Sequence, residues 1–372
     1  MKKLGFGFMR LPLINDDFEK VDKDVLCRMV DHFMEKGFRY FDTAWFYHNG
    51  QSEVAVKECL VSRYDRSEFL LADKMPLILI NDEYELAEYF ETQRLRCGVE
   101  FFDYYLVHDM GGDRRKKAEK THVFDFLKQK KADGVVKQIG FSFHDTADVL
   151  DEILMQHPEV DFVQLQINYL DWESDTIQSR KCYETAKRHG KPVIVMEPVK
   201  GGTLAALPTK AESLLRACEP DMSAASWAIR FAASLDNVMM VLSGMSNMEQ
   251  LADNTSYMEN FVPLTEKEIA MLGQVTDIIN GSIAIPCTGC SYCTVHCPKN
   301  IAIPKYFSLY NAEKRELFTK PWTAQLMLYS HLSEQFGKAS ECVGCGRCEE
   351  MCPQHLPIRK WLNEVAKKFE KA

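Results

Sequence analysis

Strand-like and helix-like segments alternate regularly through the first part of the chain, up to about Met258. Short runs rich in Val, Ile, Phe and Tyr recur eight times, and the segments between them carry apolar residues at helical spacing, such as Val25, Met29 and Phe33. A (β/α)8 TIM barrel closes with eight parallel strands and intervening helices, so this count predicts that fold. The expected strands cover residues 4–9, 38–44, 69–74, 102–108, 136–143, 162–168, 192–197 and 238–243.

An open, doubly wound sheet is the alternative α/β fold for such an alternation. That fold binds dinucleotides through a G-x-G-x-x-G turn after its first strand, and the chain contains no such turn. A further helix is expected over residues 265–279, with Thr265 and Glu268 forming a capping box and Asn280-Gly281 ending the helix. These signals predict a barrel domain at 1–280 and a second domain at 281–372.

Eight of the 13 cysteines fall in two groups near the end of the chain. Each group has the spacing C-x2-C-x2-C-x3-C-P, which is the ferredoxin run for a [4Fe–4S] cluster. In two-cluster versions of this run the fourth cysteine binds the other cluster. We therefore assign one cluster to Cys287, Cys290, Cys293 and Cys352, and the second cluster to Cys342, Cys345, Cys348 and Cys297.

Two zinc sites with four thiolates each are the alternative for these cysteines. The 44 residues between the two runs exceed what a compact ferredoxin needs, and stretches such as 321–329 look helical. A small, mainly α-helical dicluster ferredoxin-like domain is therefore expected. The other five cysteines are scattered singly, so the pattern is that of a reduced, cytoplasmic protein with dedicated metal ligands.

Charge and hydropathy exclude two classes of partner. The net charge of −9 argues against nucleic acid, whose phosphates need a basic face. No apolar run approaches the ~20 residues that span a membrane. From Gly281 onward, however, the chain carries 12 Lys and Arg against 8 Asp and Glu. This surplus of +4 offsets the charge of two ligated clusters, about −2 each.

Polar residues with acid–base chemistry stand at three successive strand ends. Asp42, Lys74 and His108 end the second, third and fourth expected strands, and Tyr47 follows Asp42 on the next loop. Each residue alone could be a helix cap, a surface charge or a core ring. Four such residues in this order at strand ends are better explained as one catalytic site. Strand ends carry the chemistry of such barrels. Asp42 would pair with Lys74, and the Lys74 cation would lower the pKa of Tyr47 from ~10 and make it a better proton donor to a carbonyl oxygen.

Here the chain closely resembles the aldo-keto reductases. The matching stretches are Phe41-Asp42-Thr43-Ala44 with Tyr47, Ala72-Asp73-Lys74, Leu106-Val107-His108, Ile139-Gly140-Phe141-Ser142, Phe162-Val163-Gln164, and Ser243-Gly244 through Asp253-Asn254. The resemblance covers roughly residues 4–260. It implies a TIM barrel that uses NADP or NAD, with Tyr47 as general acid, Asp42 and Lys74 as its tuning pair, and His108 orienting the substrate. The implied cofactor-binding residues are Ser142, Gln164, Glu197, Ser243, Gly244, Asn247, Gln250 and Asn254.

Three positions differ from the family pattern. Phe143 and His144 follow Ser142 where the family often has Asn. Met196 or Glu197 stands where many members place an aromatic ring under the nicotinamide. Residues 243–254, which should meet the adenosine phosphates, contain no Lys or Arg, so the choice between NAD and NADP stays open. Backbone N–H groups near Asn247 are candidates to hold a pyrophosphate.

The two halves together predict an NAD(P)-dependent oxidoreductase that interconverts a small carbonyl compound and its alcohol. In this hypothesis the clusters exchange electrons with a ferredoxin or other redox protein. One alternative is that the clusters are structural and only fold the tail. The other alternative is a barrel without catalytic activity that serves as a scaffold for an electron-transfer module. No residue pattern indicates a flavin that would link two-electron and one-electron steps, and the substrate is not specified.

Overall fold

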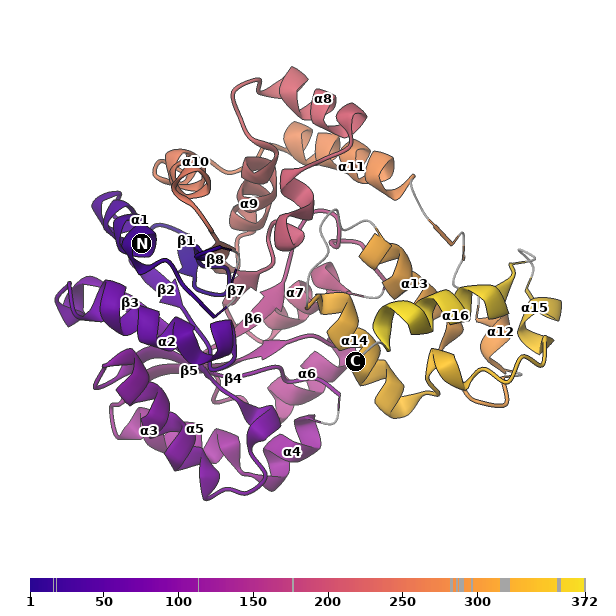
Figure 1. The fold of residues 1–372 in the computed structure, drawn as a ribbon, viewed down its shortest axis with the longest axis horizontal. Helices are drawn as coiled ribbons and strands as arrows, with labels where there is room; N and C mark the ends of the chain where they lie inside the picture. The colour runs from indigo at the N-terminus through magenta and orange to yellow at the C-terminus, as the bar shows by residue number, and fades with distance from the viewer. Residues whose placement is uncertain are drawn as a thin grey trace.

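The computed structural model describes residues 1–372 except positions 16, 18, 113, 176, 282–283, 286, 288–290, 296, 315–321, 353–355 and 371–372. Eight parallel strands form a closed barrel in which each strand pairs with the next, and β8 pairs with β1 (Figure 1). The predicted barrel is confirmed, and all eight strands lie within two residues of the expected bounds. They are β1 (Leu4–Gly7), β2 (Tyr40–Asp42), β3 (Leu70–Met75), β4 (Phe102–Val107), β5 (Val136–Phe143), β6 (Phe162–Gln166), β7 (Val193–Met196) and β8 (Val238–Gly244).

Helices surround the barrel and connect its strands (Figure 1). The expected helix after the barrel is α11, and its capping box is present: Glu268 N donates to Thr265 Oγ1 at 3.3 Å, and Glu268 Oε2 accepts from Thr265 N at 2.7 Å. The helices of this part are α1 (Lys23–Glu35), α2 (Gln51–Val56), α3 (Glu85–Cys97), α4 (Arg114–Lys120), α5 (Val123–Ala132), α6 (Ala147–Gln156), α7 (Ser179–Arg188), α8 (Thr209–Cys218), α9 (Ala224–Ser234), α10 (Met248–Met258) and α11 (Glu266–Asn280).

Five strands end one or two residues earlier than expected, and for β6 and β7 the local reason is visible. After β6, the side chain of Asn168 accepts a hydrogen bond from Asp171 N at 2.9 Å, and this turn leaves the ladder. After β7, Glu197 adopts a left-handed backbone with φ of 55°, which a strand cannot continue. Both departures lie at the C-terminal ends of strands, where a barrel places its functional loops.

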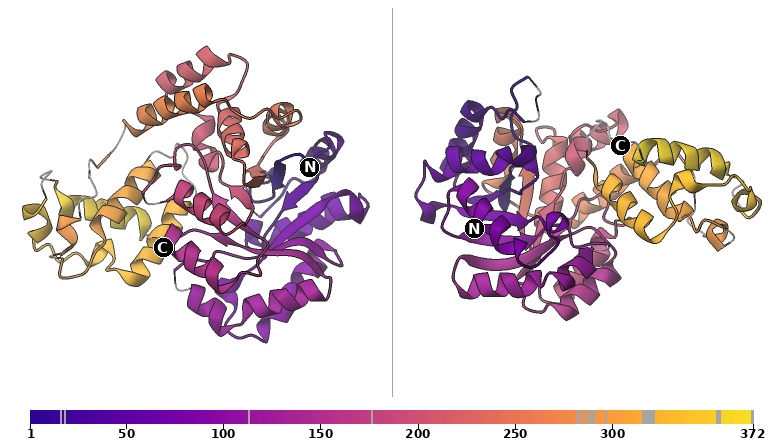
Figure 2. Two further views of the ribbon diagram at one scale, coloured as in Figure 1. Left: turned by 180° about the vertical axis from the view of Figure 1, so that it is seen from behind. Right: turned by 60° about the horizontal axis from the view of Figure 1, so that its bottom comes forward.

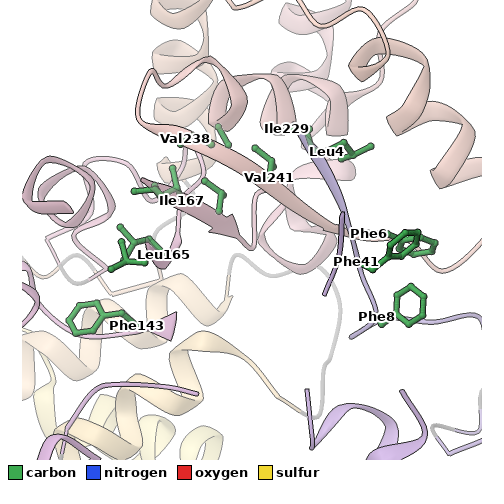
Figure 3. Packing of buried hydrophobic residues seen from close by; sticks show 14 of the residues in the cluster. Leu4, Phe6, Phe8, Phe41, Phe143, Leu165, Ile167, Ile229, Val238 and Val241 are labelled. Atoms are coloured by element: carbon green, nitrogen blue, oxygen red, sulfur yellow. The ribbon is translucent and has the colours of Figure 1, made fainter. Parts of the chain in front are cut away.

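The outward faces of the strands pack against the helices. In the β1–β2 register Phe6 pairs with Phe41, and both rings lie with Phe8 on the helix side of the sheet (Figure 3). The Phe6 and Phe8 ring centroids are 5.0 Å apart, and Phe33 of α1 lies 5.4 Å from Phe41. Since successive strand residues alternate between faces, Tyr40 and Asp42 on either side of Phe41 must point into the barrel.

A separate apolar cluster fills the barrel interior. One or two residues from most strands form it: Tyr40, Ala72, Leu106, Phe162, Ile194, Met240 and Leu242. Gly140 of β5 has no side chain because Phe162 occupies the space: a Cβ there would lie 2.5 Å from Phe162 O and 2.8 Å from the ring. The barrel is therefore a packed core and not a pore, and any site on its axis sits above this layer.

The rest of the chain forms a mainly helical module, as predicted. It comprises α12 (Tyr292–Val295), α13 (Ile303–Lys314), α14 (Ala324–Gln335), α15 (Arg347–Glu350) and α16 (Ile358–Phe369). Its core is a second apolar cluster, against which Ile177 from the barrel also packs. In Figures 1 and 2, α14 lies beside the barrel, whereas α12 and α15 lie at the end of the module that points away from it. The helix α11 ends at the predicted domain boundary. No helix in the described part of the chain is long and apolar enough to cross a membrane.

Candidate active site and cluster ligands

The barrel mouth carries one ring of inward-facing polar residues. Asp42 lies two residues after Tyr40, Lys74 two after Ala72, and His108 two after Leu106, so each follows an interior residue on the same face of its strand. Ser142 and Gln164 are register partners one layer above Gly140 and Phe162. The structure thus brings together the four predicted catalytic residues and the two predicted carboxamide-binding residues.

The ammonium group of Lys74 is the centre of this ring. It donates to Asp42 Oδ1 at 2.6 Å, to the Thr43 carbonyl at 2.8 Å and to the Tyr47 hydroxyl at 3.3 Å. Lys74 and Asp42 are both buried, with 1% and 3% exposure. Gln164 Nε2 lies 3.4 Å from the other oxygen of Asp42. A buried ion pair of this kind is tolerated only when its remaining donors and acceptors are satisfied, and here the Thr43 carbonyl and Tyr47 do this.

Tyr47 and His108 face each other across the entrance to the mouth. Tyr47 begins a short helical turn, Tyr47–Gly50, and His108 follows β4. Their rings are perpendicular with centroids 6.3 Å apart, and the Phe46 ring lies 6.0 Å from His108. His108 Nδ1 is buried without a hydrogen-bond partner among the described residues. Trp45, which could have lined the same pocket, instead stacks under the Arg96 guanidinium at 3.9 Å.

The pKa of Tyr47 differs from the expectation. Burial raises it above that of a free phenol, and the Lys74 charge, which acts in the opposite direction, only partly offsets the effect. The expected lowering is wrong because the depth of the site could not be read from the sequence. Burial disfavours the charged form of Lys74, but Asp42 outweighs it and the pKa of Lys74 is raised. Tyr47 therefore holds its proton while Lys74 keeps its charge.

His108 is neutral at physiological pH. Burial, together with the nearby Lys74 charge, lowers its pKa to about 3. A neutral imidazole can donate one hydrogen bond to a substrate oxygen without competing for the proton that Tyr47 holds. The four residues thus supply one proton donor, one fixed cation, one counter-ion and one neutral hydrogen-bonding ring.

Ser142 and Gln164 are buried at the floor of the mouth. The Ser142 hydroxyl accepts from Asp109 N at 2.9 Å, which leaves its own proton to donate. Gln164 lies in the same layer; its amide nitrogen contacts Asp42, and its amide oxygen is the acceptor. Both residues have the donor and acceptor groups that a carboxamide requires.

The predicted phosphate-binding stretch is arranged in two layers. Asn254 and Ser243 are buried and bond to each other at 2.9 Å, so they support the loop from inside. Asn247 and Gln250 are exposed at the start of α10, where Asn247 Oδ1 accepts from Gln250 N at 2.9 Å. Gly244 is exposed between them. A phosphate could reach the backbone at Gly244 and at the start of α10.

Arg10 supplies the cation that this stretch lacks in sequence. A Cβ on Gly244 would lie 3.2 Å from the Arg10 side chain, and Ser246 Oγ donates to the Arg10 carbonyl at 3.2 Å. The Arg10 guanidinium donates to Glu197 Oε1 at 2.8 Å. Glu197 therefore turns toward Arg10, and Met196 has the inward register of Ile194. No local pattern could have indicated Arg10, because it follows β1 and its partners follow β7 and β8.

A buried ion pair joins the loops after β6 and β7. Lys200 Nζ lies 2.8 Å from both carboxylate oxygens of Asp171, which also accept from Gln166 and Asn168 at 2.9 Å. Lys200 is 2% exposed and has a φ of 49°. The sequence analysis missed this pair, although the dipeptide Gly201-Gly202 directly after Lys200 marks a special backbone. The Lys200–Asp171 ion pair holds the two loops together at the rim of the mouth, beside Glu197.

The second predicted group of cysteines surrounds one cavity. Its empty volume is about 330 Å³, including space open to solvent, and it is lined by Cys297, Cys342, Cys345 and Cys348. The fourth cysteine of the first run thus lies with the first three of the second run, as the crossed assignment predicts. Cys297 Sγ also accepts from Ile301 N at 3.5 Å, a bond typical of cluster thiolates. Among the described residues, no three His, Cys, Asp or Glu side chains converge on a single-ion site.

The first predicted group is described at three of its four positions. Cys293 and Cys352 are buried in the apolar cluster of the module, and Cys287 packs against that cluster. The short helices α12 and α15, which carry the two runs, pack against each other. Cys290 lies outside the described residues. The chemistry of the donor set, sulfur only, suits iron–sulfur clusters, while the ligation itself stays a prediction.

Comparisons with known proteins agree with both halves. The sequence model of the aldo/keto reductase family matches residues 3–277, and that of a 4Fe-4S dicluster domain matches residues 286–356. An uncharacterized oxidoreductase of Bacillus subtilis, YqkF, is 24% identical over 304 residues, which are 73% of this chain and 92% of that protein. Subunit alpha 1 of an acetyl-CoA decarbonylase/synthase complex of Methanosarcina acetivorans is 29% identical over 82 residues, 22% of this chain and 8% of that protein.

Solved structures share the barrel. The holo form of an aldo-keto reductase from Bacillus halodurans has a TM-score of 0.59 and 22% identity, covering 73% of this chain and 91% of that one. An aldo-keto reductase from Klebsiella pneumoniae in complex with NADPH has a TM-score of 0.57 and 16% identity, with coverages of 74% and 90%. At these identities the likeness concerns the fold alone. From the family match over most of its length, the chain belongs to the aldo/keto reductase family and carries a 4Fe-4S dicluster domain after its barrel.

Proposed function

We propose that the barrel interconverts a small carbonyl compound and its alcohol with a nicotinamide dinucleotide. The observation that carries the proposal is the position of Lys74 Nζ, which bonds both to Asp42 and to Tyr47 at the closed floor of the mouth, beside His108. A cation held between a carboxylate and a phenol serves proton transfer to an oxygen atom. The membership of the family supports an oxidoreductase of this type.

A nicotinamide dinucleotide held by these residues would supply the hydride for the carbonyl carbon, or accept it in the reverse direction. Tyr47 donates its proton to the carbonyl oxygen, and the neutral His108 donates a hydrogen bond to the same oxygen. The phenolate left on Tyr47 is stabilised by Lys74, whose charge is in turn maintained by Asp42. The product is an alcohol that has gained one hydride and one proton.

The mouth offers groups that fit such a dinucleotide. Ser142 and Gln164 would hold the carboxamide, and the exposed backbone at Gly244, which packs against the Arg10 side chain, would meet a phosphate. Arg10 would provide the positive charge there. The alternative of a barrel without catalytic activity rested partly on the lack of a cation in residues 243–254. Arg10, which follows β1, supplies that cation and so weakens this alternative.

We propose further that the module binds two [4Fe–4S] clusters, which supply one-electron transfer. Cys345 is exposed at the cavity edge, Val343 beside it is 59% exposed, and Lys299 and Arg347 are exposed cations in the same lining. Arg347 begins α15, which lies at the end of the module away from the barrel (Figure 1). An acidic one-electron carrier of the ferredoxin kind is the partner that such an edge suits. Cysteines kept as cluster ligands fit a reducing compartment such as the cytoplasm.

A second candidate is that the clusters serve only to fold the module. The observation that favours it is the burial of Cys293, Cys348 and Cys352 within the apolar core of the module. In that case loss of a cluster would cost stability but leave turnover per folded molecule unchanged.

An anaerobic titration tests the proposal. Iron and sulfide are measured on the purified protein, and visible spectra are recorded before and after addition of NADPH or NADH with a panel of aldehydes and ketones. We expect oxidation of one dinucleotide that depends on a carbonyl compound. If neither dinucleotide binds or is oxidised, the proposal is wrong. Bleaching of the clusters by a reduced acidic ferredoxin separates the redox role from the structural role, and it should slow in Arg347→Glu.

A further inference from the structure

The helix α14 of the cluster module is pressed against the loop that follows β4. His331 of α14 is 4% exposed and lies against Gly111 and Gly112. A Cβ on Gly111 would lie 3.1 Å from the imidazole, and a Cβ on Gly112 would lie 2.7 Å from Glu334 Oε2. Gly112 also has a φ of 53°, which disfavours any other residue. The loop therefore has no room for side chains between itself and the helix.

A partly buried polar cluster joins the two parts at this contact. Asp109 Oδ2 lies 3.3 Å from Arg114 Nε and 3.6 Å from His331 Nε2, and the Arg114 guanidinium also contacts His331. Burial by itself would raise the pKa of Asp109, but His331, His144 and Arg114 together hold it at about 2. The carboxylate is thus ionised, and its partners come from both the barrel and the cluster module.

Asp109 is the residue directly after His108. It has a left-handed backbone with φ of 62°, so the chain turns sharply at the end of β4. Its N–H donates to Ser142 Oγ at 2.9 Å, and Met110 N donates to the Ser142 carbonyl at 2.8 Å. Asp109 is therefore joined to His108 through the chain and to Ser142 through this hydrogen bond.

Adhesion between the two parts does not require this arrangement. Exposed ion pairs contribute little to stability, and apolar residues of equal volume hold buried surfaces together at least as well as charged ones. Ile177 already packs on the module in this way. A partly buried polar contact on the residue next to His108 gives direction to a chain segment, because Asp109 must lie close to Arg114 and His331 at the same time.

We propose that His331 is a positioning residue of the active site. From the cluster module it fixes Asp109, and through Asp109 it fixes His108 and Ser142. The hydride-transfer site is complete only when the module is docked. This inference rests on the proposed function, since it assigns His108 and Ser142 to substrate and dinucleotide.

The test compares three variants of the full chain. His331→Ala removes the contact, His331→Gln retains a side chain that can donate to Asp109, and Ser330→Ala changes an exposed neighbour on the same helix. We expect His331→Ala to weaken dinucleotide binding, measured by fluorescence titration with NADPH and NADH, by about 10-fold, and to lower kcat more than KM changes, since displacement of a reacting group by ~1 Å costs up to 10²-fold. His331→Gln should recover most of the loss.

Hydrogen exchange supplies a readout that does not depend on a substrate. In His331→Ala the amides of Asp109 and Met110 should exchange faster, whereas those of β1 and β8 should not change. Iron content must equal that of the wild type, which shows that the module is intact. If His331→Ala fails to fold, Asp109→Asn, which keeps the shape and removes the charge, should give the same loss.

The outcomes separate the two proposals. Wild-type protein that binds no dinucleotide overturns the proposed function and this inference with it. Wild-type binding that His331→Ala leaves unchanged, together with unchanged exchange at Asp109, overturns this inference alone. A fall in melting temperature without either effect would mean that His331 is only structural, which also overturns it.

Discussion

Arg10 and Glu197 form an ion pair of 2.8 Å across the barrel mouth, although 187 residues separate them in the chain. Arg10 follows β1 and Glu197 follows β7, so the pair spans the strand β8 that lies between them in the barrel. It places one positive and one negative group beside Gly244, at the stretch expected to meet the phosphates.

Replacement of Arg10 by Ala should reduce dinucleotide affinity. Loss of one charge-assisted hydrogen bond costs about 1.5–3 kcal/mol, or roughly 10- to 100-fold in affinity. NADPH and NADH titrations of Arg10→Ala measure this loss, and a greater loss for NADPH would place Arg10 at the 2′-phosphate. Glu197→Gln is the matched comparison: it removes the carboxylate charge that competes with a phosphate for Arg10, and loss of affinity in this variant would instead give Glu197 itself the cofactor-binding role implied by the sequence. Equal affinities for wild type and Arg10→Ala would exclude the role.

Tyr47→Phe should abolish most carbonyl reduction and leave dinucleotide binding intact. Removal of a general acid lowers the rate by about 10²–10⁴-fold. Phe retains the ring that contacts His108, so the fold should not change. Single-turnover reduction by preloaded dinucleotide is the measurement. A Tyr47→Phe protein with wild-type turnover would refute the assignment of the proton donor.

Lys74→Met should damage stability as well as activity. The substitution leaves Asp42 buried without its cation, and breaking one side of a buried pair costs about 3–5 kcal/mol. The double variant Lys74→Met with Asp42→Leu should recover part of that stability and none of the activity. Chemical denaturation of the three proteins, followed by circular dichroism, checks the order.

The stability of the barrel should fall between pH 6.5 and 5 because of His108. Burial and Lys74 lower the pKa of His108 to about 3, whereas unfolding returns it to about 6.5. Below pH 6.5 the unfolded chain therefore binds a proton that the folded chain does not, and the free energy of unfolding drops. His108→Gln should remove about 2 kcal/mol of this pH dependence at pH 5. Urea titrations at pH 7 and pH 5 measure this difference, and wild type and His108→Gln would lose the same free energy of unfolding between the two pH values if His108 were not buried in its neutral form.

The crossed cluster assignment predicts which Cys→Ser substitutions affect the same cluster. Cys297→Ser and Cys345→Ser should disturb the same cluster, whereas Cys352→Ser should disturb the other, with iron falling from about eight toward four atoms per chain in each case. Electron paramagnetic resonance of the reduced proteins distinguishes the two clusters. Cys218→Ser, at an exposed cysteine on α8, is the control and should keep all iron. Similar spectra for Cys297→Ser and Cys352→Ser would contradict the crossing.

Local periodicity was sufficient to predict much of this architecture. Asp42, Lys74 and His108 could be placed because each follows an apolar strand, and the two-residue period of a strand decides which side chains face inward. The cysteine runs could be paired because their spacing encodes the ligand geometry.

Contacts between distant segments could not be predicted in this way. Arg10 with Glu197, Lys200 with Asp171, and Asp109 with His331 meet only after the barrel closes and the module docks. The predicted direction of the Tyr47 pKa shift was wrong for a related reason. A charge near a phenol can be read from spacing, but the amount of water removed around the phenol depends on everything that packs above it.

The pairing of β1 with β8 also governs how the protein can be made. The first strand of the barrel is the partner of the last, so a nascent chain that ends before β8 holds two unpaired strand edges. Such edges are templates for association with other chains. The loop that carries Arg10 can take its final position only after β8 has paired with β1, because it packs against Gly244 and Ser246. Ribosomal pausing or truncation before β8 should therefore yield aggregates, whereas truncation after α11 leaves a barrel that has closed.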